Sequence, residues 1–317
     1  MRIDGVRRPL GPVYLLALVC LMAGVLHSEN DACLSRTTLI GVAGTNGETF
    51  QGLTVADFKV SVGGKAASIQ SATPSSGPPR VVILLDTSSN HDQSTWAATQ
   101  GMVEEFLAGF PDVGDFTVLT FDDKVQQVVH ETDRATLQGT LGEMFPSGKP
   151  ESEVALAEAV KKANLGFGEY RQGDAELLIT TSDQISKETE QALGQQRVAG
   201  VRLFGASFDQ SRRRGPTLFG PGMTVENYGP LDAASKASGG LWTRVDMSRE
   251  DPTASLRSAT AAGKATATLV RNYLALELRL ASPVTKPEKL KIELMKGSKG
   301  KAQDRFATYP QELFPCQ

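Results

Sequence analysis

A short apolar segment at residues 80–85, with the sequence RVVILL, constrains the fold of this chain more than any other feature. An apolar run without polar alternation is typical of a parallel β-strand that is buried on both faces. A strand of this kind needs helices on both sides of its sheet, so the chain around it should alternate strands with helices.

The residues that follow show this alternation. Segments with apolar residues at helical spacing are separated by short apolar runs. We expect strands over residues 115–121, 176–180 and 201–208, and helices over residues 96–110, 154–165, 188–198 and 231–237. Repeated strand–helix units predict an α/β fold with a doubly wound, mostly parallel sheet, whose ligand sites lie at the carboxyl ends of the strands.

The two ends of the chain have a different pattern. Residues 38–42 and 58–62 resemble short strands, and residues 71–79, rich in Ser, Pro and Gly, resemble a linker. Residues 273–281 and 289–295 alternate apolar with polar side chains, as half-exposed strands do. We predict small β-rich additions at both ends. The division is an N-terminal β segment with linker (33–78), an α/β domain (79–250) and a β-rich C-terminal segment (251–317).

The first 28 residues have the organisation of a signal peptide. Arg2, Arg7 and Arg8 precede an apolar stretch at residues 13–25, which is short for a membrane span. An uncleaved N-terminal anchor is the alternative interpretation. No later apolar stretch approaches membrane length, so we expect the mature chain to be secreted or periplasmic, without a membrane span.

Removal of the signal segment leaves two cysteines, Cys33 and Cys316, because the third, Cys20, lies within that segment. In an oxidising compartment only one intramolecular pairing remains for them. We expect a disulfide between Cys33 and Cys316, which would join the first residues of the mature chain to the last. Two unpaired thiols near the chain ends are the alternative.

The charge balance limits the class of partner. Thirty-three basic and 36 acidic residues give a formal net charge of −3. Nucleic-acid binding depends on basic groups that replace counterions along the phosphates, and this chain has no basic excess. We therefore expect no nucleic-acid partner, while the oligomeric state stays open.

The strongest candidate site is Asp86-Thr87-Ser88-Ser89-Asn90, at the carboxyl end of the buried strand. A carboxylate followed by hydroxyl and amide oxygens at alternate positions can direct several hard ligands toward one point. Oxygen-only clusters suit Mg²⁺ or Ca²⁺. The alternative is a turn whose Asp and Ser cap the following helix.

DTSSN after VVILL resembles the metal-ion-dependent adhesion motif, Asp-x-Ser-x-Ser, of von Willebrand factor type A domains. Further pieces follow in the order of that family: GDF and TFD at 114–122, ALAEA at 155–159, LLIT at 177–180 and SGG at 238–240. GLTVADF at 52–58 and LVRNY at 269–273 are similar to exported, VWFA-related proteins typical of Acidobacteria.

The resemblance implies a Rossmann-like domain that binds protein partners, sometimes through a divalent metal completed by a carboxylate of the partner. Asp86 and Ser88 match the motif, and Asn90 replaces its second Ser. The later Thr falls at Val154, which has no ligating atom. The second Asp falls at Thr181, with Asp183 displaced by two residues. A site of Asp86, Ser88, Asn90 and Asp183 could hold Mg²⁺ or another divalent cation, but a metal-free interaction domain is the preferred expectation.

Other residues suggest competing functions. His91, or the more distant His130, could form a hydrolytic triad with Ser88 or Ser89, although no Gly-x-Ser-x-Gly elbow is present. Arg212, Arg213 and Arg214 lie in a Gly/Pro-rich segment that is either a solvated loop or a basic contact loop for a partner.

We expect an exported, non-catalytic module that binds a protein or a cell-envelope component at the carboxyl edge of the sheet. Asp86, Ser88 and Asn90 are its predicted partner-binding residues, together with the arginine segment 212–214. An exported serine hydrolase, and a structural envelope component with a vestigial metal site, are the alternatives.

Overall fold

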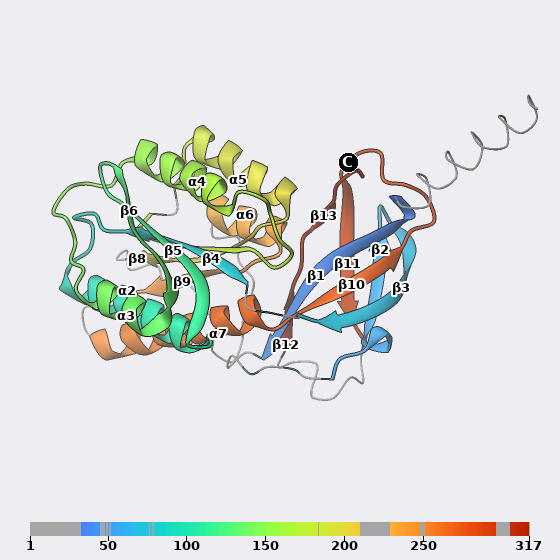
Figure 1. The fold of residues 1–317 in the computed structure, drawn as a ribbon, viewed down its shortest axis with the longest axis horizontal. Helices are drawn as coiled ribbons and strands as arrows, with labels where there is room; N and C mark the ends of the chain where they lie inside the picture. The colour runs from blue at the N-terminus through green and yellow to red at the C-terminus, as the bar shows by residue number, and fades with distance from the viewer. Residues whose placement is uncertain are drawn as a thin grey trace, which may run out of the picture.

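The computed structural model describes residues 33–44, 48, 50, 52–75, 77, 79–182, 184–209, 229–247, 251–295 and 305–316. Two sheets organise these residues: a six-stranded sheet covered by helices, and a seven-stranded sheet beside it (Figure 1). The predicted signal peptide, residues 1–28, lies outside the described residues.

The six-stranded sheet confirms the predicted fold class. Its strand order is β6-β5-β4-β7-β8-β9, and every neighbouring pair is parallel except β5 with β6. The strands are β4 (Arg80–Asp86), β5 (Val113–Phe121), β6 (Val125–Asp133), β7 (Ala175–Thr180), β8 (Arg202–Asp209) and β9 (Trp242–Asp246). The strand β4 lies between β5 and β7, so both of its edges are hydrogen-bonded.

Helices cover both faces of this sheet (Figure 1). They are α2 (Gln93–Ala108), α3 (Arg134–Gly142), α4 (Glu153–Phe167), α5 (Lys187–Ala199), α6 (Pro230–Ser238) and α7 (Pro252–Arg271). Val81, Ile83 and Leu85 of β4 pack into the core with α2, α3 and α7. Val82 and Leu84 pack into the core with α4, α5 and α6. The unbroken apolar run at residues 80–85 therefore results from burial on both faces.

The seven-stranded sheet unites the two ends of the chain. Its order is β12-β1-β10-β3-β2-β11-β13, and all of its strand pairs are antiparallel. The strands are β1 (Ser35–Gly44), β2 (Phe58–Val62), β3 (Lys65–Pro74), β10 (Tyr273–Arg279), β11 (Glu288–Leu294), β12 (Arg305–Thr308) and β13 (Glu312–Leu313), with a 3₁₀ turn η1 (Val55–Asp57) before β2. The N- and C-terminal additions thus form one sheet with one apolar core, rather than two separate elements.

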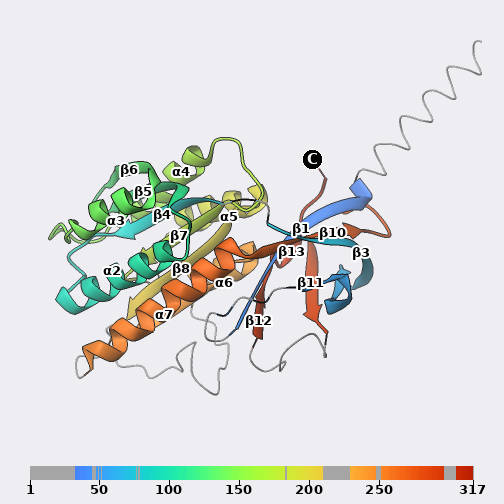
Figure 2. The same ribbon diagram turned by 60° about the horizontal axis from the view of Figure 1, so that its bottom comes forward.

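Two segments differ from the sequence-based expectation. The predicted linker at 71–79 begins with four residues of β3, which extends to Pro74. The predicted β-rich segment at 251–317 begins with the 20-residue helix α7, which lies along α2 (Figure 2). Gly263 makes this close packing possible, because a Cβ atom there would collide with the Met102 carbonyl oxygen on α2. The domain boundaries themselves stay predictions.

The expected disulfide is present: Cys33 and Cys316 are bonded, with their Cα atoms 5.5 Å apart. It joins the residues just before β1 to those just after β13. The disulfide therefore links the two ends of the part of the chain that forms the seven-stranded sheet. Within the described ranges, none of the helices is both long enough and apolar enough to cross a bilayer.

Candidate functional site

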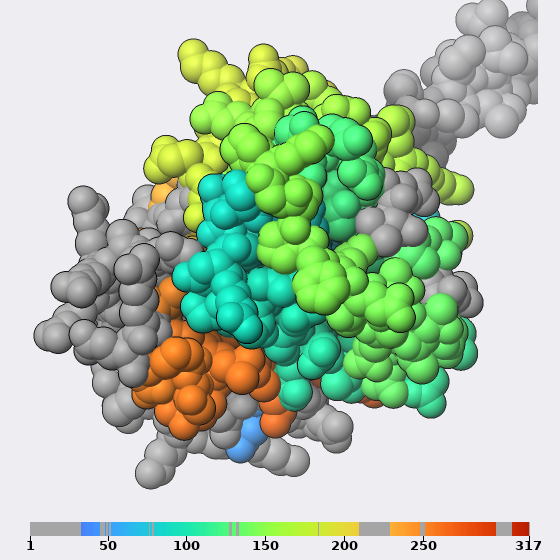
Figure 3. Space-filling view, turned by 90° about the vertical axis from the view of Figure 1, so that its left-hand side faces the viewer, coloured from blue at the N-terminus to red at the C-terminus, as the bar shows by residue number. Residues whose placement is uncertain are grey.

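The carboxyl ends of β4 and β7 bring the candidate site together. The two strands are parallel neighbours, so Asp86 at the end of β4 lies beside Thr180 and Thr181 at the end of β7. Figure 3 looks onto this edge, where the cyan atoms of the region after β4 lie beside the green atoms of the segment before α4. We call this the carboxyl edge.

Asp86 is the buried centre of the carboxyl edge, with no exposed surface. Its Oδ1 accepts a hydrogen bond from the Ser88 backbone N–H at 2.8 Å. Its Oδ2 accepts from the Thr181 backbone N–H at 3.1 Å and from the Thr181 hydroxyl at 2.7 Å. Burial alone raises the pKa of the Asp86 carboxyl, but His91 and the Ser88 hydrogen bonds outweigh it and the pKa is lowered. The carboxylate is therefore kept in its charged form.

His91 is the second buried polar group of this edge. Its Nε2 lies 3.5 Å from Asp86 Oδ2, and its side chain is completely buried. Neither ring nitrogen has a hydrogen-bond partner among the described residues. The ring lies edge-on to Trp96, with the ring centroids 5.4 Å apart. The indole N–H of Trp96 in turn donates to the Met144 carbonyl at 3.2 Å.

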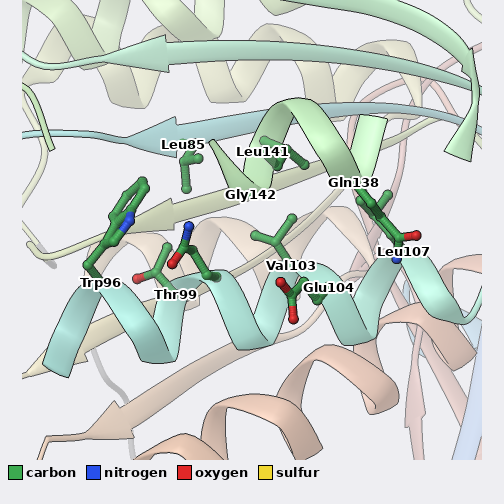
Figure 4. A pocket seen from close by; sticks show the side chains of 10 residues that line it. Leu85, Trp96, Thr99, Val103, Glu104, Leu107, Gln138, Leu141 and Gly142 are labelled. Atoms are coloured by element: carbon green, nitrogen blue, oxygen red, sulfur yellow. The ribbon is translucent and has the colours of Figure 1, made fainter. Parts of the chain in front are cut away.

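Trp96 also lines an apolar pocket between α2 and α3, together with Val103, Leu107 and Leu141 (Figure 4). The pocket continues the apolar core beneath the carboxyl edge. It therefore lies beneath the part of the site that contains His91, and its lining also includes the polar residues Thr99, Glu104 and Gln138.

Ser88 and Asn90 have different exposures. Ser88 is fully buried, and its hydroxyl accepts from the Asn90 backbone N–H at 3.4 Å, whereas Asn90 is exposed. The predicted alternative role of this segment, capping the next helix, belongs instead to Asp92, which accepts from the Thr95 N–H at 2.8 Å. Asp86 and Ser88 therefore shape the turn itself.

Glu151 is the functional candidate that the sequence interpretation missed. Its Oε1 accepts from the Thr180 hydroxyl at 3.3 Å, and its Oε2 from the Thr181 hydroxyl and the Asn90 amide, both at 3.5 Å. Burial, followed by the charge of Asp86, raises the pKa of Glu151 to about 7. Its position two residues before the first residue of α4 is the one sequence signal that could have indicated it.

Backbone hydrogen bonds bring Glu151 to this place. The Ser147 N–H donates to the Thr87 carbonyl at 2.7 Å, and the Ser89 N–H donates to the Lys149 carbonyl at 2.6 Å. The loop before α4 is thus fastened to the loop after β4. These contacts form only in the folded chain, so residue spacing alone does not predict them.

The Mg²⁺ site that the resemblance implies stays a prediction, because one of its residues, Asp183, lies outside the described residues. Val154 lies on the first turn of α4 with 69% of its surface exposed and has no ligating atom. Thr181 contributes no charge, and its N–H and hydroxyl are both directed at Asp86 Oδ2, which has about two lone pairs to offer. No group of three or more His, Cys, Asp or Glu side chains suited to a metal occurs in the part of the chain that the structure describes. Asp183, Arg212, Arg213 and Arg214 lie outside that part, and their roles stay predictions.

The geometry does not assemble a hydrolytic triad from the described residues. The Ser88 hydroxyl contacts a backbone N–H, while the His91 nitrogens have no hydroxyl partner in the described structure. His130 is on β6, where its Nδ1 lies 2.9 Å from the Thr117 hydroxyl. A serine nucleophile activated by histidine therefore has no support at this edge.

The opposite, amino edge of the sheet holds two arginines, Arg80 and Arg202, whose terminal guanidinium nitrogens are hydrogen-bonded within the chain, although the Arg202 Nε has no partner among the described residues. Arg80 at the start of β4 pairs with Asp174 at 2.6 Å. Arg202 at the start of β8 donates to the carbonyls of Gly173, Leu269 and Val270 at 3.3, 3.0 and 2.9 Å. Burial lowers the pKa of Arg202 to about 10, which leaves it protonated at neutral pH. Since Leu269 and Val270 belong to the last turn of α7, these hydrogen bonds fix the end of the helix, from which the chain continues into β10.

No family model matches this chain, and no curated protein matches it. Solved structures do. BatB from Bacteroides thetaiotaomicron is 17% identical over 59% of this chain and 99% of its own, with a TM-score of 0.43. Proximal thread matrix protein 1 from the mussel byssus, with a zinc-occupied MIDAS motif, is 14% identical over 66% of this chain and 50% of its own, at 0.47.

A von Willebrand factor type A structure from Catenulispora acidiphila is 9% identical over 88% of this chain and 72% of its own, with a TM-score of 0.46. TM-scores of 0.43 to 0.47 are too low for us to base an argument on these likenesses. The fold class is given by the strand order of the chain itself.

Proposed function

We propose that this protein is an exported, non-catalytic interaction module of the von Willebrand factor type A kind, which binds a protein or cell-envelope partner at the carboxyl edge. The observation that carries the proposal is the convergence there of three segments: Asp86 and Asn90 at the end of β4, Thr181 after β7, and Glu151 before α4. In doubly wound sheets, ligands bind at this edge because the loops that follow the strands are free to carry function.

The binding surface is preorganised without a metal. Thr181 fixes Asp86 from the side of β7, and the Ser88 N–H fixes it from its own loop. This holds Asn90 and Glu151 at the surface, so a partner does not have to order them on binding. Export is supported by the signal-like segment 1–28 and by the Cys33–Cys316 disulfide, because disulfides persist in oxidising compartments.

A structural envelope component with a vestigial metal site is the second candidate. Val154 and Thr181, which replace two charged or hydroxyl ligands of the motif in addition to the Asn90 replacement, favour it. In that case the carboxyl edge contacts no partner, and changes there affect only folding. An exported hydrolase would need a histidine in contact with Ser88 or Ser89, and no observation favours it.

Site-specific photo-crosslinking tests the interaction function. A photoreactive phenylalanine analogue placed at Asn90 should capture a discrete protein in the producing cells. The same group at Leu165, a residue of α4 with 81% of its surface exposed, is the matched control and should capture nothing comparable. Equal capture from both positions, or none from Asn90, would contradict the proposal.

A further inference from the structure

Glu151 has only weak, neutral partners. Within the described part of the chain, its contacts are two hydroxyls and one amide at 3.3–3.5 Å. Hydrogen bonds to a carboxylate are ordinarily about 2.5–2.9 Å long. The carboxylate is therefore largely taken from water without receiving short hydrogen bonds or a counter-charge in return.

Three other buried carboxylates of the described chain either have a cationic partner or are enclosed in the core. Asp174 pairs with Arg80 at 2.6 Å, and Asp232 pairs with Lys236 at 2.6 Å. Glu176, which accepts a hydrogen bond from the neutral Gln196 amide at 2.5 Å, is enclosed in the core, where burial raises its pKa to about 8. Glu151 is instead only partly buried, at an edge that a partner can reach.

His91 gives an independent indication that the edge is incomplete. Its side chain is wholly buried, its Nε2 points at Asp86, and both ring nitrogens lack a hydrogen-bond partner among the described residues. A buried polar group without a partner costs free energy that a binding partner can recover. The polar network around Asp86 therefore contains a buried imidazole that the described residues leave without a hydrogen bond.

Exposed apolar side chains flank Glu151 along the chain. Phe145 has 76% and Val154 has 69% of its surface exposed. Phe145 follows Met144, which the Trp96 indole holds, and Val154 lies on the first turn of α4. Exposed aromatic and aliphatic side chains in the segment that carries a partly buried charge are typical of a protein interface.

We propose that the carboxyl edge receives a basic side chain of the protein partner, preferably an arginine, and that Glu151 accepts its guanidinium. This deepens the proposed function and rests on it. The polarity is opposite to that of a site at which a metal ion binds an acidic group of the partner.

Arginine fits this edge better than lysine. Its planar fork matches both oxygens of a carboxylate, which the compact ammonium group of lysine does not. Asp86 is kept negatively charged by its hydrogen bonds, and this second negative charge near Glu151 also attracts a guanidinium. Glu151 then acquires the cation that the described chain does not supply.

Peptide titration tests this proposal with the purified protein. Four acetylated heptapeptides differ only at the central residue, which is Arg, Lys, citrulline or Glu, with leucines on both sides. Binding is measured from the NMR shifts of the Asn90 and Thr181 backbone amides. We expect the Arg peptide to bind about tenfold more tightly than its neutral citrulline isostere, and the Glu peptide to bind weakest.

Glu151→Gln should remove the preference for Arg over citrulline. Glu153→Gln deletes the same charge two residues away, at an exposed position of α4, and should keep the preference. Thermal melts of both variants check that they are folded. Equal binding of the Arg and citrulline peptides, or a preference that survives Glu151→Gln, would overturn the inference. If Asn90 crosslinks a partner and the Arg preference is absent, this inference fails while the proposed function stands. If Asn90 captures nothing, the proposed function itself fails.

Discussion

The two edges of the six-stranded sheet differ in the partners that the chain provides for their buried ionisable side chains. At the amino edge, Arg80 has Asp174 as its counter-ion, and Arg202 has three backbone carbonyls. At the carboxyl edge, His91 has no hydrogen-bond partner among the described residues, and Glu151 has only long contacts to neutral donors. The amino-edge arginines thus have a counter-ion or several short hydrogen bonds from the chain itself, with only the Arg202 Nε unpaired among the described residues, whereas at the carboxyl edge we propose that a partner supplies the missing contacts.

The amino edge therefore has a structural role, whereas the carboxyl edge has the properties of a binding site. The amino edge faces the seven-stranded sheet, and Arg202 fixes the last turn of α7 just before β10 (Figure 1). A site that binds a partner needs polar groups with unused capacity, and such groups reduce stability when the partner is absent. Variants at the two edges should therefore have different effects.

The largest expected effect is at Arg202. Arg202→Met removes the cation and leaves three buried carbonyls without a donor, so we expect a loss of about 3–5 kcal/mol in the free energy of unfolding. Urea denaturation measures it. Arg257→Met, on an exposed face of α7, is the control and should cost less than about 0.5 kcal/mol. Equal effects of the two variants would show that the amino edge does not hold the structure together.

Asp86→Asn should have the next largest effect. The variant loses a charged acceptor of three hydrogen bonds, and we expect a loss of about 2 kcal/mol at pH 7. Because the folded pKa of Asp86 is lowered, this stability is present above the unfolded pKa and disappears as the pH falls through the folded pKa. Denaturation at pH 7 and pH 3 should show the difference from wild type shrinking in acid. Asp123→Asn, at an exposed ion pair, should cost less than about 1 kcal/mol.

Glu151→Gln should have a smaller effect of opposite sign. A carboxyl with a raised pKa binds more protons in the folded state, so the wild-type protein loses stability as the pH rises from about 4.5 through about 7. The variant lacks this loss and should be the more stable by about 1 kcal/mol at pH 8, with little difference at pH 5. Thermal melts across this range measure it. A variant less stable than wild type at pH 8 would mean that the ionised Glu151 carboxylate does not destabilise the folded state.

Much of the six-stranded sheet could be predicted because burial on both faces determines its sequence. Residues 81–85 and 177–179 are apolar for that reason and lie in β4 and β7. Helix α7 was missed because Ala, Ser, Thr and Gly form its interface with α2 and give no strong apolar stripe. The joining of both chain ends in one sheet depends on pairing between β1 and β10, over 230 residues apart, which no local pattern encodes.

The candidate site was only partly predictable for a similar reason. Asp86, Ser88 and Asn90 follow a recognisable strand, so their position at its carboxyl end could be inferred. Glu151 and Thr181 join them through contacts between loops. The Cys33–Cys316 pair was predictable because removal of the predicted signal segment, which contains Cys20, would leave no other pairing.

The account depends most directly on the carboxyl edge working without a metal. We would measure the thermal melt of the protein in excess Mg²⁺, Mn²⁺ or Ca²⁺ and in chelator, with Asp86→Ala in parallel. The account predicts the same midpoint in all conditions. A site filled at about 100 times its dissociation constant adds about 2.7 kcal/mol, enough to raise the midpoint by several degrees. A rise of that size that is absent in Asp86→Ala would contradict the account and establish a metal-dependent adhesion site.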